Sequence, residues 1–190
     1  MRRWIVVFFF LLLFSMSWTA SSGVVLNPEA GFQYVYSDGF RSALDRVYPR
    51  RSISGDNGWY GLMVGFKYQP SNQFEIIPRA GFLLNYIRVD GGDESFLNTI
   101  IQPALAARMH FDPGASFFIE GEVSYNAVNT GSDSFNVEGG VGYAGLVGYR
   151  WRSGMNLAIG YALTSVDVTH ANRTKNHNFG GLDVRLRLEF

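Results

Sequence analysis

The last nine residues of the chain, LDVRLRLEF at 182–190, alternate strictly between apolar and charged side chains. Successive side chains of a β-strand point to opposite faces, so this stretch is expected to form a strand with two different faces. The apolar face carries Leu182, Val184, Leu186, Leu188 and Phe190. The charged face carries Asp183, Arg185, Arg187 and Glu189. Such a strand needs an apolar environment on one side and a polar environment on the other.

Seven earlier segments repeat this alternation, at 32–36, 58–68, 76–86, 101–109, 117–125, 137–151 and 155–164. A soluble β-sandwich also has alternating strands and is the main alternative. Here, however, Tyr, Phe and Trp gather at the strand ends, and isolated charges lie within the opposite faces. Aromatic girdles and a polar interior are typical of transmembrane barrels. The pattern therefore predicts an all-β protein, a closed antiparallel up-and-down transmembrane β-barrel of about eight strands.

The connections between these segments alternate in length. Short turns are expected near 69–73, 112–116 and 152–154, and longer polar loops at 38–57, 89–98, 128–134 and 168–178. Outer-membrane barrels have short periplasmic turns, longer outside loops and an even number of strands. This order places both ends of the mature chain on the periplasmic side.

The first 22 residues have the composition of a secretory signal peptide. Arg2 and Arg3 precede an apolar run from Trp4 to Phe14, and Ala20 and Ser22 fit a small-residue cleavage site. A retained transmembrane anchor is the alternative, but the apolar run is shorter than the roughly 20 residues that span a bilayer as a helix. We therefore expect a signal peptide at 1–22 and a barrel domain at 23–190.

The composition excludes several classes of function. The chain has 190 residues, no cysteine and a formal net charge of zero. Without cysteine there can be no disulfide, redox dithiol or thiolate zinc site. The balanced charge gives no reason to expect a nucleic-acid partner. We expect no cofactor and no metal, because no glycine-rich phosphate loop or metal-ligand cluster is present.

The C-terminus resembles the final-strand signature of bacterial outer-membrane proteins. The resemblance is carried by terminal Phe190, by the apolar alternation back to Leu182 and by Gly180–Gly181. In pattern it covers the whole mature chain and extends to the small OmpA/OmpX-type and opacity-type barrels. It implies a bacterial outer-membrane location and recognition of Leu186, Leu188 and Phe190 by the barrel assembly machinery. It carries no activity, and no peptidoglycan-anchoring module is expected after Phe190.

The inner faces of the strands are expected to carry a network of paired charges. Its members are Arg79, Arg108, Glu120, Glu122, Glu138, Arg185 and Arg187. An eight-stranded barrel has an interior that side chains just fill, so a wide pore is not expected. Buried charges must be paired, since an unpaired one costs several kcal/mol. The alternative is a narrow channel or a small-ligand carrier that uses the lumen.

Catalysis on lipid is the second alternative, and the histidines offer little for it. His110 is expected beside a short turn, and His170 and His177 in the last long loop, near Ser165 and Asp167. A nucleophile and base could meet there, but the spacing matches no esterase signature. We expect neither catalytic residues nor an enzyme.

The long loops offer basic residues for binding at the cell surface. They are Arg41, Arg46, Arg50, Arg51, Arg173 and Lys175. Arginine forks suit phosphate, so lipopolysaccharide is a candidate partner beside the outer-membrane lipid. A solvated charged loop is the plainer interpretation. The expected function is a structural or surface-interaction role, in adhesion or envelope integrity, through loops whose further ligand is unknown.

Overall fold

The computed structural model describes residues 26–37, 39, 42, 45, 53–55, 57–89, 95–112, 116–130, 136–170 and 173–190. The expected signal peptide and its cleavage site lie outside these residues. Among the described residues, no helix is long and apolar enough to cross a membrane.

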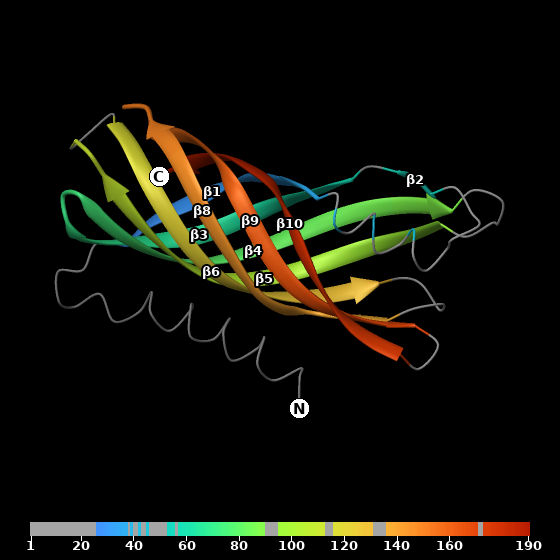
Figure 1. The fold of residues 1–190 in the computed structure, drawn as a ribbon. Coiled ribbons are helices and arrows are strands. Elements are labelled where there is room, and N and C mark those ends of the chain that lie inside the picture. The colour runs from blue at the N-terminus through green and yellow to red at the C-terminus, as the bar shows by residue number, and fades with distance from the viewer. Residues whose placement is uncertain are drawn as a thin grey trace.

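The described chain forms one antiparallel sheet that curves round until its first and last strands meet (Figure 1). The barrel strands are β1 (Leu26–Tyr36), β3 (Gly58–Ser71), β4 (Phe74–Val89), β5 (Ser95–His110), β6 (Ser116–Thr130), β8 (Gly140–Arg150), β9 (Met155–His170) and β10 (Arg173–Glu189). Two short strands, β2 (Ile53–Gly55) and β7 (Asn136–Glu138), pair with β4 and β9. The prediction of a closed eight-stranded barrel is confirmed.

The barrel closes between β1 and β10. Phe32 pairs with Leu186 and Gln33 with Arg185, so the alternation of each strand continues across the seam. The backbone N–H of Phe190 donates to the carbonyl oxygen of Pro28 at 3.0 Å. Closure of this kind leaves no open strand edge in the membrane, where unpaired backbone groups would cost several kcal/mol each.

The two ends of the barrel differ in their connections. At one end, the turn end, β3 to β4, β5 to β6 and β8 to β9 are joined by 72–73, 111–115 and 151–154, as predicted. At the other, the loop end, strands reach farther than expected (Figure 1). The stretch at 168–178 is a hairpin rather than a loop, because Arg173 of β10 pairs with His170 of β9. The C-terminus lies at the turn end, where the Glu189 N–H donates to the carbonyl of Gly154.

The outer and inner surfaces of the wall have opposite chemistry. Large apolar side chains on the outside are exposed, such as Leu62 at 67% and Val147 at 58%. Charged side chains on the inside are buried, and Arg108, Arg185 and Arg187 are each 0% exposed. A surface of this kind is stable where lipid, not water, covers the outside.

The predicted alternation fails at one place, between β7 and β8. Glu138 of β7 pairs with Asp167, whereas Gly142 of β8 pairs with Thr164, so one extra residue lies between them. Such a β-bulge exchanges the two faces of a strand. Val137 therefore points inward and is 3% exposed, although we expected it on the outer face. Glu138 is exposed, and its predicted place in the lumen is wrong.

Candidate functional site: a charged plug and an apolar cup

Charged side chains fill the half of the lumen next to the turn end, and we call this set the plug. The acidic members are Glu29, Glu75, Glu120, Glu122, Asp183 and Glu189. The basic members are Lys67, Arg79, Arg108, Arg150, Arg185 and Arg187. Six acids therefore face six bases, and the plug is neutral when His110 is neutral.

Glu120 lies at the centre of the plug. Its carboxylate accepts hydrogen bonds from Arg79 at 2.6 and 3.0 Å, from Arg108 at 2.8 Å and from Arg187 at 2.9 and 2.8 Å. Two arginines also contact the Phe118 ring, with guanidinium carbons 4.7 Å (Arg108) and 5.8 Å (Arg187) from its centre. Charge-assisted bonds of this kind are the strong ones, and here they join β4, β5, β6 and β10.

Arg185 joins two carboxylates of the plug, Glu122 and Asp183. Its Nη1 donates to Glu122 at 2.5 Å, and its Nη2 donates to Glu122 at 2.8 Å and to Asp183 at 2.7 Å. Gln33 of β1 donates to the same Asp183 at 3.1 Å. These contacts tie the closing seam of the barrel to β6 on the opposite wall.

A second group of plug residues lies at the mouth of the turn end. Glu75 accepts from Arg108 and from Arg150, each at 3.0 Å. Glu189, the penultimate residue, accepts from Lys67 and from Arg108. The mouth is therefore closed by side chains of β3, β4, β5 and β8 together with the C-terminal end of β10.

Glu75, His110 and Ser116 lie in a row at this mouth. His110 Nε2 is 3.2 Å from Glu75 Oε1, and His110 Nδ1 is 3.2 Å from Ser116 Oγ. The order of acid, imidazole and hydroxyl matches that of a nucleophilic triad. All three side chains are 4% exposed or less, and Glu75 is already bound by two arginines, so a substrate has no access to the hydroxyl. We interpret the row as part of the plug.

The structure brings six of the seven predicted luminal charges together, Arg79, Arg108, Glu120, Glu122, Arg185 and Arg187, and leaves out Glu138. The predicted network also left out Lys67, Arg150, Asp183 and Glu189, which lie within the predicted strands. Sequence reasoning missed Glu29 and Glu75 altogether. Both were detectable, because Glu29 is four residues before inward-facing Gln33 and Glu75 is four residues before Arg79. An even spacing keeps strand residues on one face. The predicted segments simply began too late.

A layer of amide side chains covers the plug toward the loop end. Gln102 donates to Asn126 Oδ1 at 2.8 Å, and Asn126 donates to Thr164 Oγ1 at 3.3 Å. Between β5 and β4, Asn98 donates to Asn85 at 3.3 Å. This layer carries no charge and separates the plug from the space beyond it.

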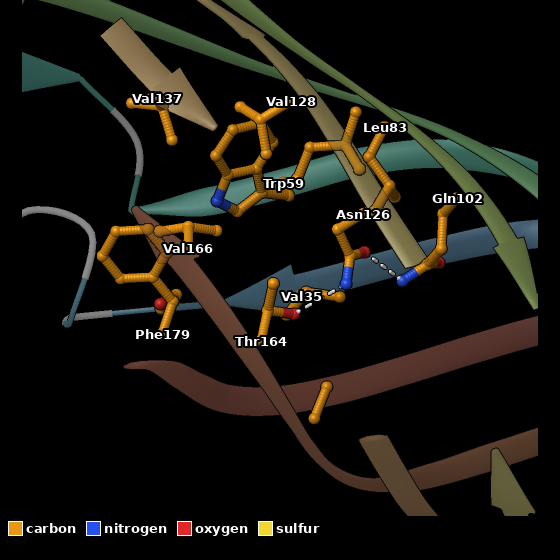
Figure 2. A pocket seen from close by; sticks show the side chains of 13 residues that line it. Val35, Trp59, Leu83, Gln102, Asn126, Val128, Val137, Thr164, Val166 and Phe179 are labelled. Atoms are coloured by element: carbon orange, nitrogen blue, oxygen red, sulfur yellow. Dashed lines mark hydrogen bonds between the residues drawn. The ribbon is translucent and has the colours of Figure 1, made fainter. Parts of the chain in front are cut away.

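The space beyond the amide layer is a small cavity, which we call the cup (Figure 2). Its wall is mainly apolar and includes Trp59, Leu83, Ile100, Val137, Val166 and Phe179. Its polar lining is Ser37, Gln102, Asn126 and Thr164, and no charged residue of the described part of the chain lines it. The room for water molecules is about 40 Å³, enough for a few of them.

The predicted surface residues are only partly described. Arg41, Arg46, Arg50 and Arg51 lie outside the described residues. Arg173 and Lys175 belong to strand β10 and not, as predicted, to a loop. The predicted assembly residues lie on the outer face, where Leu186 is 46%, Leu188 49% and Phe190 72% exposed.

No protein-family model and no curated protein matches this sequence. Two of the solved structures that match share the fold over most of the chain. The outer membrane protein OprG from Pseudomonas aeruginosa aligns over 87% of this chain and 95% of its own, with a TM-score of 0.52 and 14% identity. Neisserial surface protein A aligns over 87% and 97%, with a TM-score of 0.52 and 16% identity. Together with the closed wall and its apolar outer face, they show that the chain has the fold of the small bacterial outer-membrane β-barrels.

Proposed function

We propose that the protein is a non-conducting barrel of the bacterial outer membrane that acts through its loop end, in envelope integrity or in surface binding. The fold and the exposed apolar outer wall support the location. The observation that supports the absence of conduction is the plug. Six acidic and six basic side chains fill the turn-end half of the lumen and neutralise one another.

The plug opposes ion passage for two reasons. Most of its arginines are bound by several carboxylates, as Arg79 is by Glu29, Glu120 and Glu122, so moving such a side chain aside breaks several strong bonds at once. Its neutral total leaves no net charge that would draw one kind of ion into the lumen. A narrow channel is therefore the less favoured function for this barrel.

Conductance across a planar lipid bilayer tests this proposal. The wild-type protein, purified from outer membranes, should give no current steps above the bare bilayer. The double variant Arg185→Ala/Glu122→Ala removes one base and one acid, keeps the plug neutral and should give small steps. Regular current steps from the wild type would contradict a closed lumen.

The loop end supports the surface part of the proposal. The β9–β10 hairpin, with Arg173 and Lys175 at the start of β10, continues past Val35–Asp183, the last pair that joins β1 to β10. Basic residues at this end would meet lipopolysaccharide phosphates. The variant Arg173→Glu/Lys175→Glu should bind lipopolysaccharide micelles more weakly than wild type. Equal binding would remove these two residues from the proposal.

We propose no enzymatic role. The support is the burial of the Glu75–His110–Ser116 row and the engagement of Glu75 by arginines. An unchanged lipid A mass spectrum from cells that produce the protein is the expected result. A mass shift that disappears in Ser116→Ala would overturn this part.

A further inference from the structure

The cup contains a polar group that the barrel itself leaves unused. Ser37 follows the last residue of β1, lines the cup and is 3% exposed. Its backbone N–H donates to Asn57 at 2.8 Å, but its Oγ has no hydrogen-bond partner among the described residues. A hydroxyl taken out of water without a partner is unfavourable, so such groups are rare unless something binds to them.

The surroundings of Ser37 restrict what could bind. Among the residues that the structure describes, no lining residue is charged, so an ion would lose its hydration without a counter-charge from this wall. The wall offers two aromatic rings, Trp59 and Phe179, with Leu83, Ile100 and Val166, and these favour an apolar body (Figure 2). The amides of the floor largely satisfy one another, since Gln102 donates to Asn126 and Asn126 to Thr164. Ser37 is therefore the group best placed to bind a polar atom.

We propose that the cup is a binding site for the end of a small uncharged amphiphile, an alkyl or aryl alcohol, whose hydroxyl bonds to Ser37 Oγ while its hydrocarbon lies against Trp59 and Phe179. The ligand enters from the loop end. The plug closes the other side, so the site captures the molecule and does not pass it to the turn end.

The size of the cup limits the ligand to a short chain or a single ring. About 40 Å³ of room for water admits only part of a larger molecule, and the remainder projects toward the loop end. Bulky or charged lipids are excluded by size and by the uncharged lining. This selectivity follows from the lining alone and does not depend on whether the plug conducts.

Tryptophan fluorescence gives a direct test, because Trp59 lines the cup. Removal of residues 1–22, verified by mass spectrometry, leaves Trp59 and Trp151, and Trp151 is exposed at the turn end. In the Trp151→Phe protein, purified from outer membranes, 6-bromohexan-1-ol should quench Trp59 with saturation. The Trp59→Phe protein reports simple partition into detergent or lipid, because there the same probe can reach only Trp151.

Four further variants separate binding from partition and from misfolding. Ser37→Ala should weaken the binding of 6-bromohexan-1-ol by about three- to tenfold, as expected for one lost hydrogen bond. The binding of 1-bromohexane, which has no hydroxyl, should be unchanged. Ala162→Phe, with Ala162→Ile as a milder change, should fill the cup and abolish saturation. Leu163→Phe, the next residue on the outer face, should not. Quenching of Trp59 that rises linearly like that of Trp151, or that is indifferent to Ser37→Ala, would overturn the proposal, whatever the conductance.

Discussion

At the scale of single residues, Glu120 shows how the barrel tolerates charge in its interior. A carboxylate has about four acceptor sites, and those of Glu120 receive hydrogen bonds from three arginines. Each arginine in turn reaches further partners, as Arg79 reaches Glu29 at 2.6 Å. Removing Glu120 leaves Arg187 without a carboxylate partner and gives the plug a net buried charge, whereas removing one acid together with one base keeps the total charge balanced.

The first prediction concerns this residue. Glu120→Gln should lower the free energy of unfolding by about 3–5 kcal/mol, because three buried arginines lose their shared carboxylate. The matched control is Asp167→Asn in the loop-end hairpin, where an exposed Asn176 donates to the carboxylate. It should change stability by less than about 1 kcal/mol. Urea unfolding in lipid vesicles measures both, and equal losses would argue against a plug centred on Glu120.

A second residue-scale prediction concerns the lipid face. Leu157 is 43% exposed on the outside, so Leu157→Arg should cost roughly 2–4 kcal/mol in vesicles, whereas Leu157→Met should be nearly neutral. Asn156, its neighbour on the inner face, is not the mild site that alternation alone suggests. It donates to Glu189 and accepts from Arg187, so Asn156→Arg should also destabilise the fold. A neutral Leu157→Arg would reverse the assignment of faces.

At the scale of elements, strands were predictable and their mutual stagger was not. A period of two identifies strands and faces locally, which is why Arg79 and Arg185 were assigned correctly to the inside. Which charge meets which depends on how far each strand slides past the next, and alternation does not encode this. The bulge beside Gly139 was not predicted either, because one extra residue in a glycine-rich stretch leaves no clear signal in the sequence. The contribution of Val137 to the cup was therefore not predicted, since Val137 reaches the lumen only through that bulge.

The third prediction belongs to strand β10. Phe190 is 72% exposed, and its backbone N–H makes a bond that a shortened chain would lose. Its deletion should therefore reduce refolding in detergent only modestly. Cellular levels in the outer membrane should fall much further, if the assembly machinery reads this residue. Quantitative blotting of membranes beside a refolding yield makes the comparison, and unchanged cellular levels would remove the signal role.

At the scale of the whole molecule, the lumen is layered from one end to the other. Charges fill the turn end, amides such as Gln102 and Asn126 form a middle layer, and apolar side chains line the loop end. The outer wall is apolar along the whole length of these layers. The outer surface of the sheet therefore suits lipid, whereas its inner surface changes from charged to apolar. The layering gives the barrel a direction, with a closed end and a hollow end.

The fourth prediction tests that direction. The natural chain has no cysteine, so single introduced cysteines report position without background. Thr174→Cys, exposed in the loop-end hairpin, should react with a membrane-impermeant maleimide on intact cells. Arg152→Cys, exposed in a turn-end connection, should react only after the outer membrane is broken. The reverse pattern would place the turn end outside.

The plug also has a consequence for how the protein folds. Many of its partners lie far apart along the chain: Lys67 and Glu189 are 122 positions apart, and Glu120 and Arg187 are 67 positions apart. The β5–β6 hairpin pairs Arg108 with Glu120, but both residues also bind partners on distant strands. Closing such long loops is entropically costly. Folding should therefore be slow and highly cooperative, with stability gained only when β10 meets β1. A barrel that stops short of closure keeps uncompensated charges and an open strand edge. These two features distinguish the incompletely folded protein from the closed barrel.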